Sequence, residues 1–244
     1  MDRALRLLVL LRQQGRISVT ATARHLDVAP STAHRLLSAL CHRDFAVRDR
    51  DRQYRPGPEL NETSMQPLSI TALRRVARPA LEWLHARTQE TSHLMVLSGA
   101  NVRFIDGVEG EKTLRVGLRT GLQFPAYCTS GGKAMLAAGP KARVDELHRD
   151  GLPPWPNARI KDLAQLQRHL TTIRRQRYAV NREESEQGIV AIGSCIRDDI
   201  GRPQAAVSVS IPSGHYRPAD LLRYSEAVLH ATWSVEASLF RTSP

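Results

Sequence analysis

The sequence predicts an α+β protein with two parts, an N-terminal winged helix-turn-helix and a C-terminal domain in which helices pack on an antiparallel sheet. Residues 1–58 carry three short helical patterns and then a hairpin pattern, the element order of a winged helix-turn-helix. Residues 78–244 carry runs of strand patterns that enclose helical ones, as in α+β domains. We expect residues 59–77 to form a partly helical linker. The chain has 244 residues, 41% of them hydrophobic, so it can bury a core.

The first two helices of the N-terminal part are predicted from an apolar stripe and a capping residue. The first helix is expected to end near Gly15, and Ser18 is a suitable N-cap for the second. Residues 27–30 then force a turn, because the residue before Pro30 is pushed out of the helical conformation. The expected stripe of the first helix consists of Leu5, Leu8, Val9 and Leu11.

A third helix is expected to begin near Ser31, with one apolar face and one polar face. Its inward residues recur at helical spacing and are Ala33, Leu36, Leu37 and Leu40. Its other face carries Ser31, Thr32, Arg35 and Ser38, with His34 at the margin. Alternation in residues 45–55 predicts a β-hairpin whose tip is residues 49–52.

The C-terminal part alternates between strand and helix patterns. Gly201 supplies the permissive residue of a turn that joins the last two strands. Strands are expected at 93–99, 102–109, 114–121, 189–197 and 204–212, and helices at 79–89, 130–138, 143–149, 163–177 and 218–240.

The charge of the chain points to a polyanionic partner. The formal net charge is +11 and the isoelectric point is near 10.4, which favours nucleic acid first and an anionic membrane surface second. Residues 1–60 hold eleven arginines and six acidic residues, so the positive charge is densest at the N-terminus. The winged helix-turn-helix is therefore the predicted contact with double-stranded DNA.

The third helix supplies the side chains expected to read base edges in the major groove. Arg35 can bind guanine through two hydrogen bonds, and Ser31 and Thr32 can donate to phosphates or bases. Arginines at the hairpin tip can follow the backbone or enter the minor groove. An ordinary three-helix bundle with a solvated polar face is the alternative. The predicted DNA-binding residues are Ser18, Ser31, Thr32, His34, Arg35, Ser38, Arg50 and Arg52.

Two segments of the C-terminal part suggest a ligand site. Small residues in 129–136 (TSGGKAML) lead into a helix, whose free backbone N–H groups can hold an anion. The phosphate-loop pattern is not met there, and plain capping by Thr129 or Ser130 is an equal alternative. Ser208 and Ser210 lie two apart on a predicted strand, so their hydroxyls share a face. That face can also be the solvent side of the strand.

The sequence contains no pattern typical of a catalytic or metal site. It lacks G-x-S-x-G, H-E-x-x-H and a C-x-x-C pair, and its three cysteines have neither disulfide-framework nor zinc spacing. Cys128 has no identifiable partner base and is expected to be buried filler. The early apolar run at 7–11 is too short for a signal peptide or a membrane span. We expect a soluble cytoplasmic protein that is not an enzyme, needs no cofactor or metal, and does not bind membranes.

Several stretches resemble the IclR family of bacterial transcriptional regulators. They are RALRLLVLL, STAHRLLSAL and YRPGPEL in the first half, and LRVGLRTGLQFPAYCTSGGKAMLA and YAVNREESEQGIVAIGSCIRDDIGRPQAAVSVSIPS in the second. The similarity runs over nearly the whole chain in the right order. It implies a winged helix, a linker helix involved in dimerisation and a GAF-like effector-binding domain. Pro30 departs from the family pattern, which commonly has Lys there, and the hairpin tip has no glycine.

The resemblance also implies an effector pocket and its residues. It places Ser130 and Gly131 at a backbone-amide site and Ser208 and Ser210 at a hydroxyl pair. Asn181 stands where an acidic residue is frequent, so it tolerates an anionic ligand, and Ala191 leaves room for a bulkier, aromatic acid. The predicted effector-binding residues are Tyr127, Ser130, Gly131, Asn181, Ala191, Ser208 and Ser210.

The function expected from the sequence is that of a transcription factor controlled by a small organic acid. It is expected to bind a roughly palindromic operator as a homodimer or a dimer of dimers. An enzyme tethered to DNA and a non-specific architectural DNA binder are the alternatives.

Overall fold

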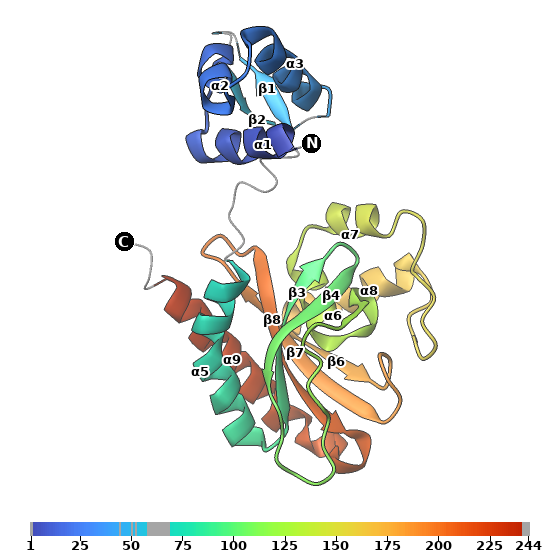
Figure 1. Cartoon of the computed structure of the whole chain (residues 1–244). Coiled ribbons are helices and arrows are strands. Elements are labelled where there is room, and N and C mark those ends of the chain that lie inside the picture. Colours follow the sequence, from blue (N-terminus) through green and yellow to red (C-terminus); the bar gives the residue numbers. More distant parts are fainter. Residues whose placement is uncertain (1, 44, 50, 52, 58–68, 241–244) are drawn as a thin grey trace. The chain divides into compact units, whose positions relative to one another are not determined.

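The computed structural model describes residues 2–43, 45–49, 51, 53–57 and 69–240 (Figure 1). The chain forms two compact units, residues 1–67 and residues 68–244. Each unit has its own hydrophobic core, so each is described by itself. None of the helices built from the described residues is long and apolar enough to cross a membrane.

The first unit has the element order of a winged helix-turn-helix, as the sequence predicts. Its two strands form an antiparallel hairpin in which Val47 pairs with Arg55. The last strand also bridges to Ile17, just before the second helix. The elements are α1 (Asp2–Gln14), α2 (Val19–Leu26), α3 (Pro30–Cys41), β1 (Ala46–Arg48) and β2 (Tyr54–Pro56).

The apolar stripe predicted for α1 is partly wrong. Leu5 and Val9 are exposed, whereas Leu7, Leu10 and Leu11 are buried in the core with residues of α2, α3 and the hairpin. Residues 7, 10 and 11 lie on one face of a helix because they are spaced by three and four positions. Leu5 and Val9 are four apart as well, but they belong to a neighbouring face that the rest of the unit does not cover.

Local contacts set the ends of these elements. The Ser18 side chain accepts a hydrogen bond from the Ala21 N–H at 3.1 Å, which confirms Ser18 as the N-cap of α2. Asp27 takes the left-handed conformation, with φ of 50°, and ends that helix. In the hairpin, the Asp49 carboxylate accepts the N–H groups of Asp51 and Gln53 at 3.0 and 2.9 Å. This side chain organises the turn, so the tip needs no glycine.

The second unit is built on one curled antiparallel sheet of six strands (Figure 1). The strand order is β5-β4-β3-β8-β7-β6, so the two central strands come from opposite ends of the unit's sequence. The strands are β3 (Thr91–Ser98), β4 (Asn101–Val108), β5 (Gln123–Pro125), β6 (Tyr178–Arg182), β7 (Ile189–Arg197) and β8 (Pro203–Pro212).

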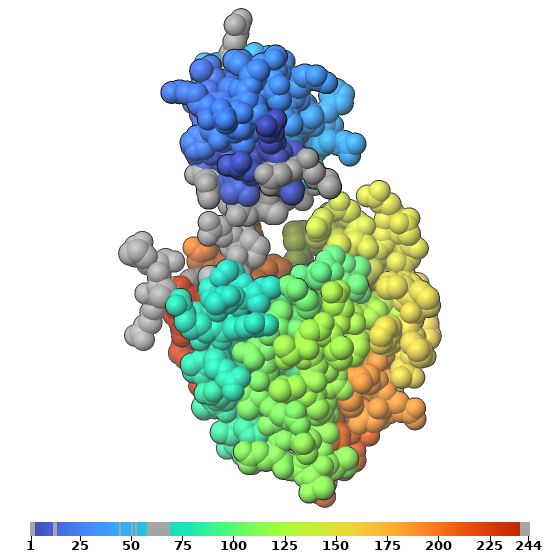
Figure 2. Space-filling model, viewed as in Figure 1, coloured from blue at the N-terminus to red at the C-terminus, as the bar shows by residue number. Residues whose placement is uncertain are grey.

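Helices cover both faces of the sheet, which confirms the predicted α+β class. Two long helices, α5 (Ile70–Thr88) and α9 (Leu221–Phe240), pack side by side on one face over a core that includes Val207, Val209 and Ile211 of β8. The other face packs against α6 (Ser130–Ala138), with α8 (Leu163–Gln176) and α7 (Lys141–Leu147) beyond it. In the space-filling view, the green segment that contains β4 and the following loop spreads over the middle of the visible face (Figure 2).

Three elements differ from the sequence expectation. Helix α5 begins at Ile70 rather than 79, because Ser69 caps it and Pro79 lies inside it instead of in its first turn. The strand predicted at 114–121 does not form, since the edge strand that pairs with β4 is β5, at 123–125. Strand β6 was not expected, although it pairs with β7 along its whole length.

Candidate functional site

The polar face predicted for α3 is present on the first unit. Ser31, His34 and Arg35 are exposed, and Thr32 and Ser38 are half-buried. Ala33, Leu37 and Leu40 are buried on the opposite side of the helix and fix its orientation in the unit. This face therefore presents an arginine, a histidine and three hydroxyl groups from one rigid element.

The remaining predicted DNA contacts have different surroundings. The Ser18 hydroxyl is half-buried and serves as the cap of α2. Arg50 and Arg52 lie outside the described residues. Further arginines are exposed on this unit, and they are Arg3, Arg6, Arg16, Arg24, Arg43, Arg48 and Arg55. These side chains keep the described surface of the unit strongly basic.

A small hollow of about 20 Å³, partly open to solvent, lies on the α6 side of the sheet in the second unit. Its walls combine aromatic and aliphatic side chains with hydroxyl, amide and charged groups. The lining residues are Met95, Phe104, Arg119, Phe124, Thr129, Ser130, Asn181, Ser185, Glu186, Ile189, Ala191, Ser208 and Ser210.

The register of the sheet explains why predicted residues from distant segments meet there. Ser210 pairs with Ala191 across β8 and β7, and Ala191 pairs with Asn181 across β7 and β6. Residues directly opposite in an antiparallel pair present side chains on the same face. Ser208 and Ser210 share that face, as predicted, and both are buried, so it is not a solvent side.

Two predicted pocket residues do not line the hollow. The Tyr127 hydroxyl donates to the Pro153 carbonyl at 2.6 Å, and its ring packs edge-on against His148, which places it in the core between helices. Gly131 faces Met95 and Ala206, and a Cβ atom there would require the Met95 thioether to move. The turn before α6 thus brings Thr129 and Ser130, but not Gly131, to the hollow.

Capping, one of the two interpretations of the segment before α6, is confirmed, and anion binding there stays a prediction. The Thr129 hydroxyl accepts a hydrogen bond from the Gly132 N–H at 3.1 Å, so Thr129 caps the helix. Thr129 and Ser130 also line the hollow at the helix N-terminus. Capping and an anion-binding position are therefore compatible here.

The Asn181 side chain stabilises a turn as well as lining the hollow. Its side-chain oxygen accepts the Glu184 N–H at 2.8 Å, and its amide nitrogen donates to the Ser185 hydroxyl at 2.5 Å. These bonds hold the turn between β6 and β7 against the hollow. Because an uncharged amide is used, the wall carries no buried negative charge at this position.

Sequence reasoning missed the charged pair on the wall. Arg119, from the loop between β4 and β5, and Glu186, from the turn between β6 and β7, form an ion pair at 2.6 Å. They are 67 residues apart, so no local spacing could indicate the pair. The aromatic residues Phe104 and Phe124 were also missed, and their rings pack edge-on at 5.6 Å.

A second ion pair lies buried beside the hollow. The Lys133 ammonium donates to the Glu184 carboxylate at 2.5 Å and to the Val180 carbonyl at 2.9 Å. The side chains of Lys133 and Glu184 are 2% and 9% exposed. Burial lowers the pKa of Lys133, and Glu184 opposes that effect. This pair joins α6 to the turn that carries Ser185 and Glu186.

Cys128 does not have the properties of a nucleophile. Its thiol is buried and lies 3.2 Å from the Pro125 carbonyl. Burial raises the pKa of the Cys128 thiol to about 12, so it stays protonated at neutral pH. These properties agree with the expectation that Cys128 is a buried packing residue.

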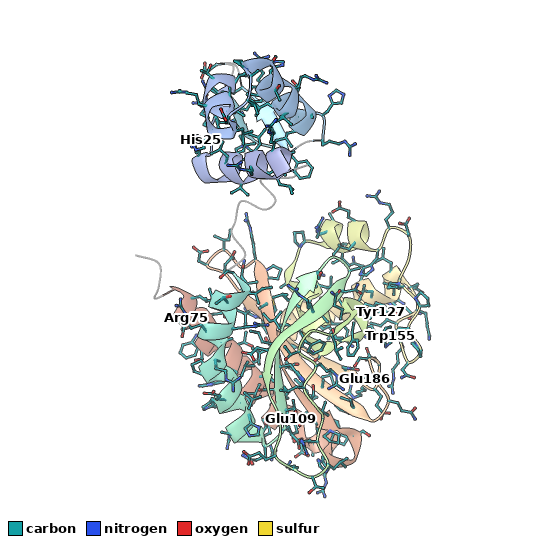
Figure 3. All side chains as sticks on the ribbon, in the orientation of Figure 1. His25, Arg75, Glu109, Tyr127, Trp155 and Glu186 are labelled. Atoms are coloured by element: carbon teal, nitrogen blue, oxygen red, sulfur yellow. The ribbon has the colours of Figure 1, made fainter. Side chains whose placement is uncertain are left out.

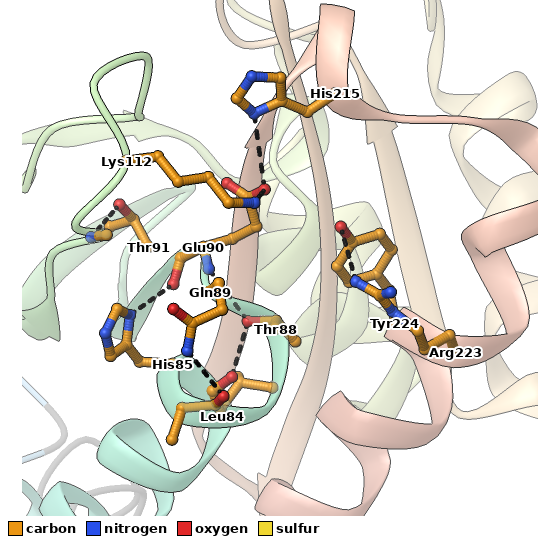
Figure 4. Close-up of polar contacts among 12 residues, drawn as sticks. Leu84, His85, Thr88, Gln89, Glu90, Thr91, Lys112, His215, Arg223 and Tyr224 are labelled. Atoms are coloured by element: carbon orange, nitrogen blue, oxygen red, sulfur yellow. Dashed lines mark hydrogen bonds and ion pairs between the residues drawn. The ribbon is translucent and has the colours of Figure 1, made fainter.

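A polar cluster centred on Glu90 lies at the C-terminal end of α5, outside the hollow (Figure 4). The Glu90 carboxylate is 1% exposed and pairs with Lys112 at 2.6 Å, while His215 lies 3.7 Å away. The His85 ring is hydrogen-bonded to the Glu90 carbonyl at 3.1 Å. These contacts join α5 to the loop after β4 and to the segment after β8.

His93 is the buried histidine nearest to the predicted hydroxyl pair. It pairs with Ser208 across β3 and β8, and its Nδ1 lies 3.3 Å from the Ser210 hydroxyl. Burial, together with the positive charge of Arg119, lowers the pKa of His93 to about 3, although a Gly117 backbone contact opposes the shift. His93 is therefore neutral at physiological pH and can orient the Ser210 hydroxyl by hydrogen bonding.

The low pKa of His93 predicts that the fold loses stability in mild acid. Below about pH 6.5 the unfolded chain takes up a proton that the folded protein does not, so stability falls as the pH falls from about 6.5 towards 3. We expect His93 to account for a loss of about 2 kcal/mol in the free energy of unfolding between pH 7 and pH 5.

Urea unfolding of the wild type and of His93→Asn at both pH values measures this effect. The variant should lose less stability than the wild type over the same interval. His148, whose pKa burial also lowers, is present in both proteins and cancels in the comparison. An equal loss in the two proteins would contradict the assignment to His93.

Comparisons with known proteins agree over both units. The model of the C-terminal domain of the bacterial transcriptional regulator IclR matches residues 65–237, and that of the IclR helix-turn-helix domain matches residues 1–50. The HTH-type transcriptional regulator BhcR of Paracoccus denitrificans is 32% identical over 233 residues, covering 95% of this chain and 84% of BhcR.

Solved structures share the fold. The IclR structure of Thermotoga maritima matches with a TM-score of 0.66 at 30% identity, covering 98% of this chain and 97% of that one. An IclR homologue of Microbacterium hydrocarbonoxydans, solved in complex with 4-hydroxybenzoate, matches with a TM-score of 0.62 at 24% identity and covers 98% of each chain. The curled sheet with helices on both faces agrees with the GAF-like domain that the resemblance implies. The chain therefore belongs to the IclR family and is a transcriptional regulator with a DNA-binding helix-turn-helix and a C-terminal effector domain.

Proposed function

We propose that this regulator binds a small organic acid, aromatic acids included, in the hollow beside α6, and that the acid changes its affinity for operator DNA. The observation that supports the proposal is the make-up of the hollow. Phe104, Phe124 and Met95 offer an apolar wall, while hydroxyls, an amide and the Arg119–Glu186 pair offer hydrogen bonds. Such a mixture suits a ligand with an apolar body and a few polar groups.

The protein acts by coupling two binding equilibria, not by catalysis. A ligand that favours one arrangement of the protein changes DNA affinity by the same free energy with which DNA changes ligand affinity. A dimer or dimer of dimers, binding a roughly palindromic operator, is the assembly that we propose, with the cytoplasm as its location. The regulator can then act as a repressor or an activator according to operator position.

The test compares two duplexes, the intergenic DNA upstream of the regulator's own coding sequence and a random duplex of equal length. Binding is measured at two salt concentrations, with and without a panel of aliphatic and aromatic acids that includes 4-hydroxybenzoate. We expect a preference for the upstream duplex that one acid alters. Equal binding to both duplexes, steeply dependent on salt and indifferent to every acid, would leave only a non-specific electrostatic contact.

Replacing Arg35 with alanine tests the DNA-reading face of α3. Arg35 is exposed beside Ser31 and His34, and an arginine that binds guanine contributes about 1 to 3 kcal/mol to discrimination against the wrong base. We expect Arg35→Ala to lose about this much affinity for the operator and to relax the base preference at one position of each half-site.

Selection of bound sequences from a randomised operator pool measures the preference. Arg143→Ala is the control, because Arg143 is exposed in the second unit and carries the same charge. If Arg35→Ala weakens specific and random DNA equally, Arg35 contacts phosphate and not a base.

A further inference from the structure

We infer that Arg119 is the group that pairs with the carboxylate of the ligand, and that Glu186 is the partner which the ligand displaces. This inference rests on the proposed function, because it concerns the same hollow. Neither residue was singled out by the sequence. Their importance follows from their geometry, their unequal exposure and the charges around them.

The geometry places the pair on the wall of the hollow. The Arg119 Nε and Nη2 atoms each lie 2.6 Å from the same Glu186 oxygen, and Nη1 donates to the Gly117 carbonyl at 2.9 Å. Both side chains line the hollow. The Gly117 contact anchors the guanidinium independently of Glu186, so Arg119 can keep its position when its acidic partner leaves.

The two partners differ in exposure, which decides which of them can be displaced. The Arg119 side chain is 11% exposed, whereas that of Glu186 is 39% exposed. Release of Glu186 into solvent has a small cost because its carboxylate is already partly hydrated. An unpaired Arg119 would remain largely buried and poorly solvated. We therefore expect the ligand carboxylate to replace Glu186 beside Arg119, while Glu186 moves into solvent.

The charges of the hollow select the class of ligand. Among the described residues that line it, Arg119 and Glu186 are the charged ones, since Asn181 is neutral. Once Glu186 has moved away, the wall carries one uncompensated positive charge. A guanidinium binds a carboxylate through two parallel hydrogen bonds, so a ligand with one carboxylate restores the balance. A neutral amide of the same shape cannot do so.

The apolar wall and a nearby tryptophan complete the site. Phe124 packs against Trp155 at 5.5 Å, and the Trp155 indole N–H donates to the Ser185 carbonyl at 2.8 Å. Ser185 immediately precedes Glu186, so Trp155 contacts both the ring wall and the turn that carries the displaced glutamate. Figure 3 shows Trp155 and Glu186 on the same side of the unit. Trp155 fluorescence therefore reports movement of this turn.

The experiment measures acid binding to purified full-length variants by titration calorimetry and by Trp155 fluorescence. The probes are acetate, pyruvate, benzoate and 4-hydroxybenzoate, and 4-hydroxybenzamide is the neutral analogue. Fluorescence uses a background in which Trp83 and Trp233, both on the α5–α9 face, are phenylalanine. The variants are Glu186→Gln, Arg119→Gln and the double variant.

Glu109→Gln is the matched control. Glu109 pairs with Arg115 at 2.7 Å in the same loop as Arg119 but does not line the hollow. Circular dichroism and thermal melts of each variant show whether it has folded.

The exchange predicts opposite effects of the two single substitutions. Glu186→Gln removes the competitor and should raise acid affinity about fivefold, the factor given by loss of one partly exposed ion pair. Arg119→Gln should weaken acid binding about tenfold or more because it removes charge-assisted hydrogen bonds. The double variant should bind as weakly as Arg119→Gln, and 4-hydroxybenzamide should respond to neither change. Glu109→Gln should behave as the wild type.

Three other results would overturn the inference. If both single variants bind the acid more weakly by similar factors, the ion pair only holds the loop and the turn together, and the ligand does not displace Glu186. If acids bind and release DNA but Glu186→Gln changes nothing, the exchange fails while the proposed function stands. If no acid binds either the wild type or Glu186→Gln, the inference and the acid-controlled function fail together.

Discussion

Replacement of Lys133 with methionine is expected to lower the free energy of unfolding by about 3 to 5 kcal/mol. Methionine fills nearly the same volume, so the loss comes from the Glu184 carboxylate, which would be left buried without its partner. The Val180 carbonyl would also lose its bond from the ammonium. Urea unfolding followed by circular dichroism, at pH 7, measures the difference.

A second substitution separates the lost charge pair from lost packing. In Lys133→Met with Glu184→Gln no unpaired charge remains, so we expect the double variant to recover a large part of the stability. Arg143→Met, at an exposed ion pair on α7, is the control and should change stability by less than about 1 kcal/mol. A Lys133→Met protein as stable as the control would show that Glu184 finds water or another partner.

Replacement of Gly193 with valine is expected to destabilise the second unit by about 3 kcal/mol or more and to weaken ligand binding. Gly193 lies on β7 directly beneath the start of α6. A Cβ atom there would lie 2.8 Å from the Gly131 backbone nitrogen and 2.9 Å from the Ser130 hydroxyl. Backbone cannot move aside as a flexible side chain can, so the helix end must lift from the sheet and carry Ser130 away from the wall.

Gly214→Ala is the matched control, because a Cβ atom at Gly214 meets no other atom within 4 Å. Thermal unfolding of the two variants gives the stability difference, and calorimetry with 4-hydroxybenzoate gives the effect on the hollow. A Gly193→Val protein with wild-type stability and affinity would show that α6 is not held closely against β7. Reduced stability with unchanged affinity would show that Ser130 does not contribute to binding.

Much of the fold could be predicted from local patterns, and the exceptions have physical causes. The helix at 130–138 and the strand at 189–197 were predicted with the bounds that the structure has, since capping marks the helix and a run of apolar and small residues marks the strand. The run at 114–121 has the composition of a strand, but hydrogen bonds to β4 are made by residues 123–125 instead. Which of two segments pairs with the edge of a sheet depends on tertiary packing, and a local sequence pattern does not contain that information.

The hollow could be predicted only in part for a similar reason. Ser208 and Ser210 are two apart on one strand, so period-two alternation was enough to place them together. Arg119 and Glu186 meet because the loop after β4 and the turn after β6 come from opposite edges of the sheet and approach each other over one face, which depends on the whole topology. Tyr127 is close in sequence to the wall, yet its hydroxyl bond to Pro153 turns it into the core.

The alternation of β8 separates the residues of the hollow from those of the core. Ser208 and Ser210 face the hollow, while Val207, Val209 and Ile211 face the core under α5 and α9. Substitution of Ser208 or Ser210 therefore changes the wall of the hollow without removing a side chain from the core beneath the two long helices. In the proposed ligand site, the residues that would contact the ligand and the residues that hold the domain together thus alternate along a single strand.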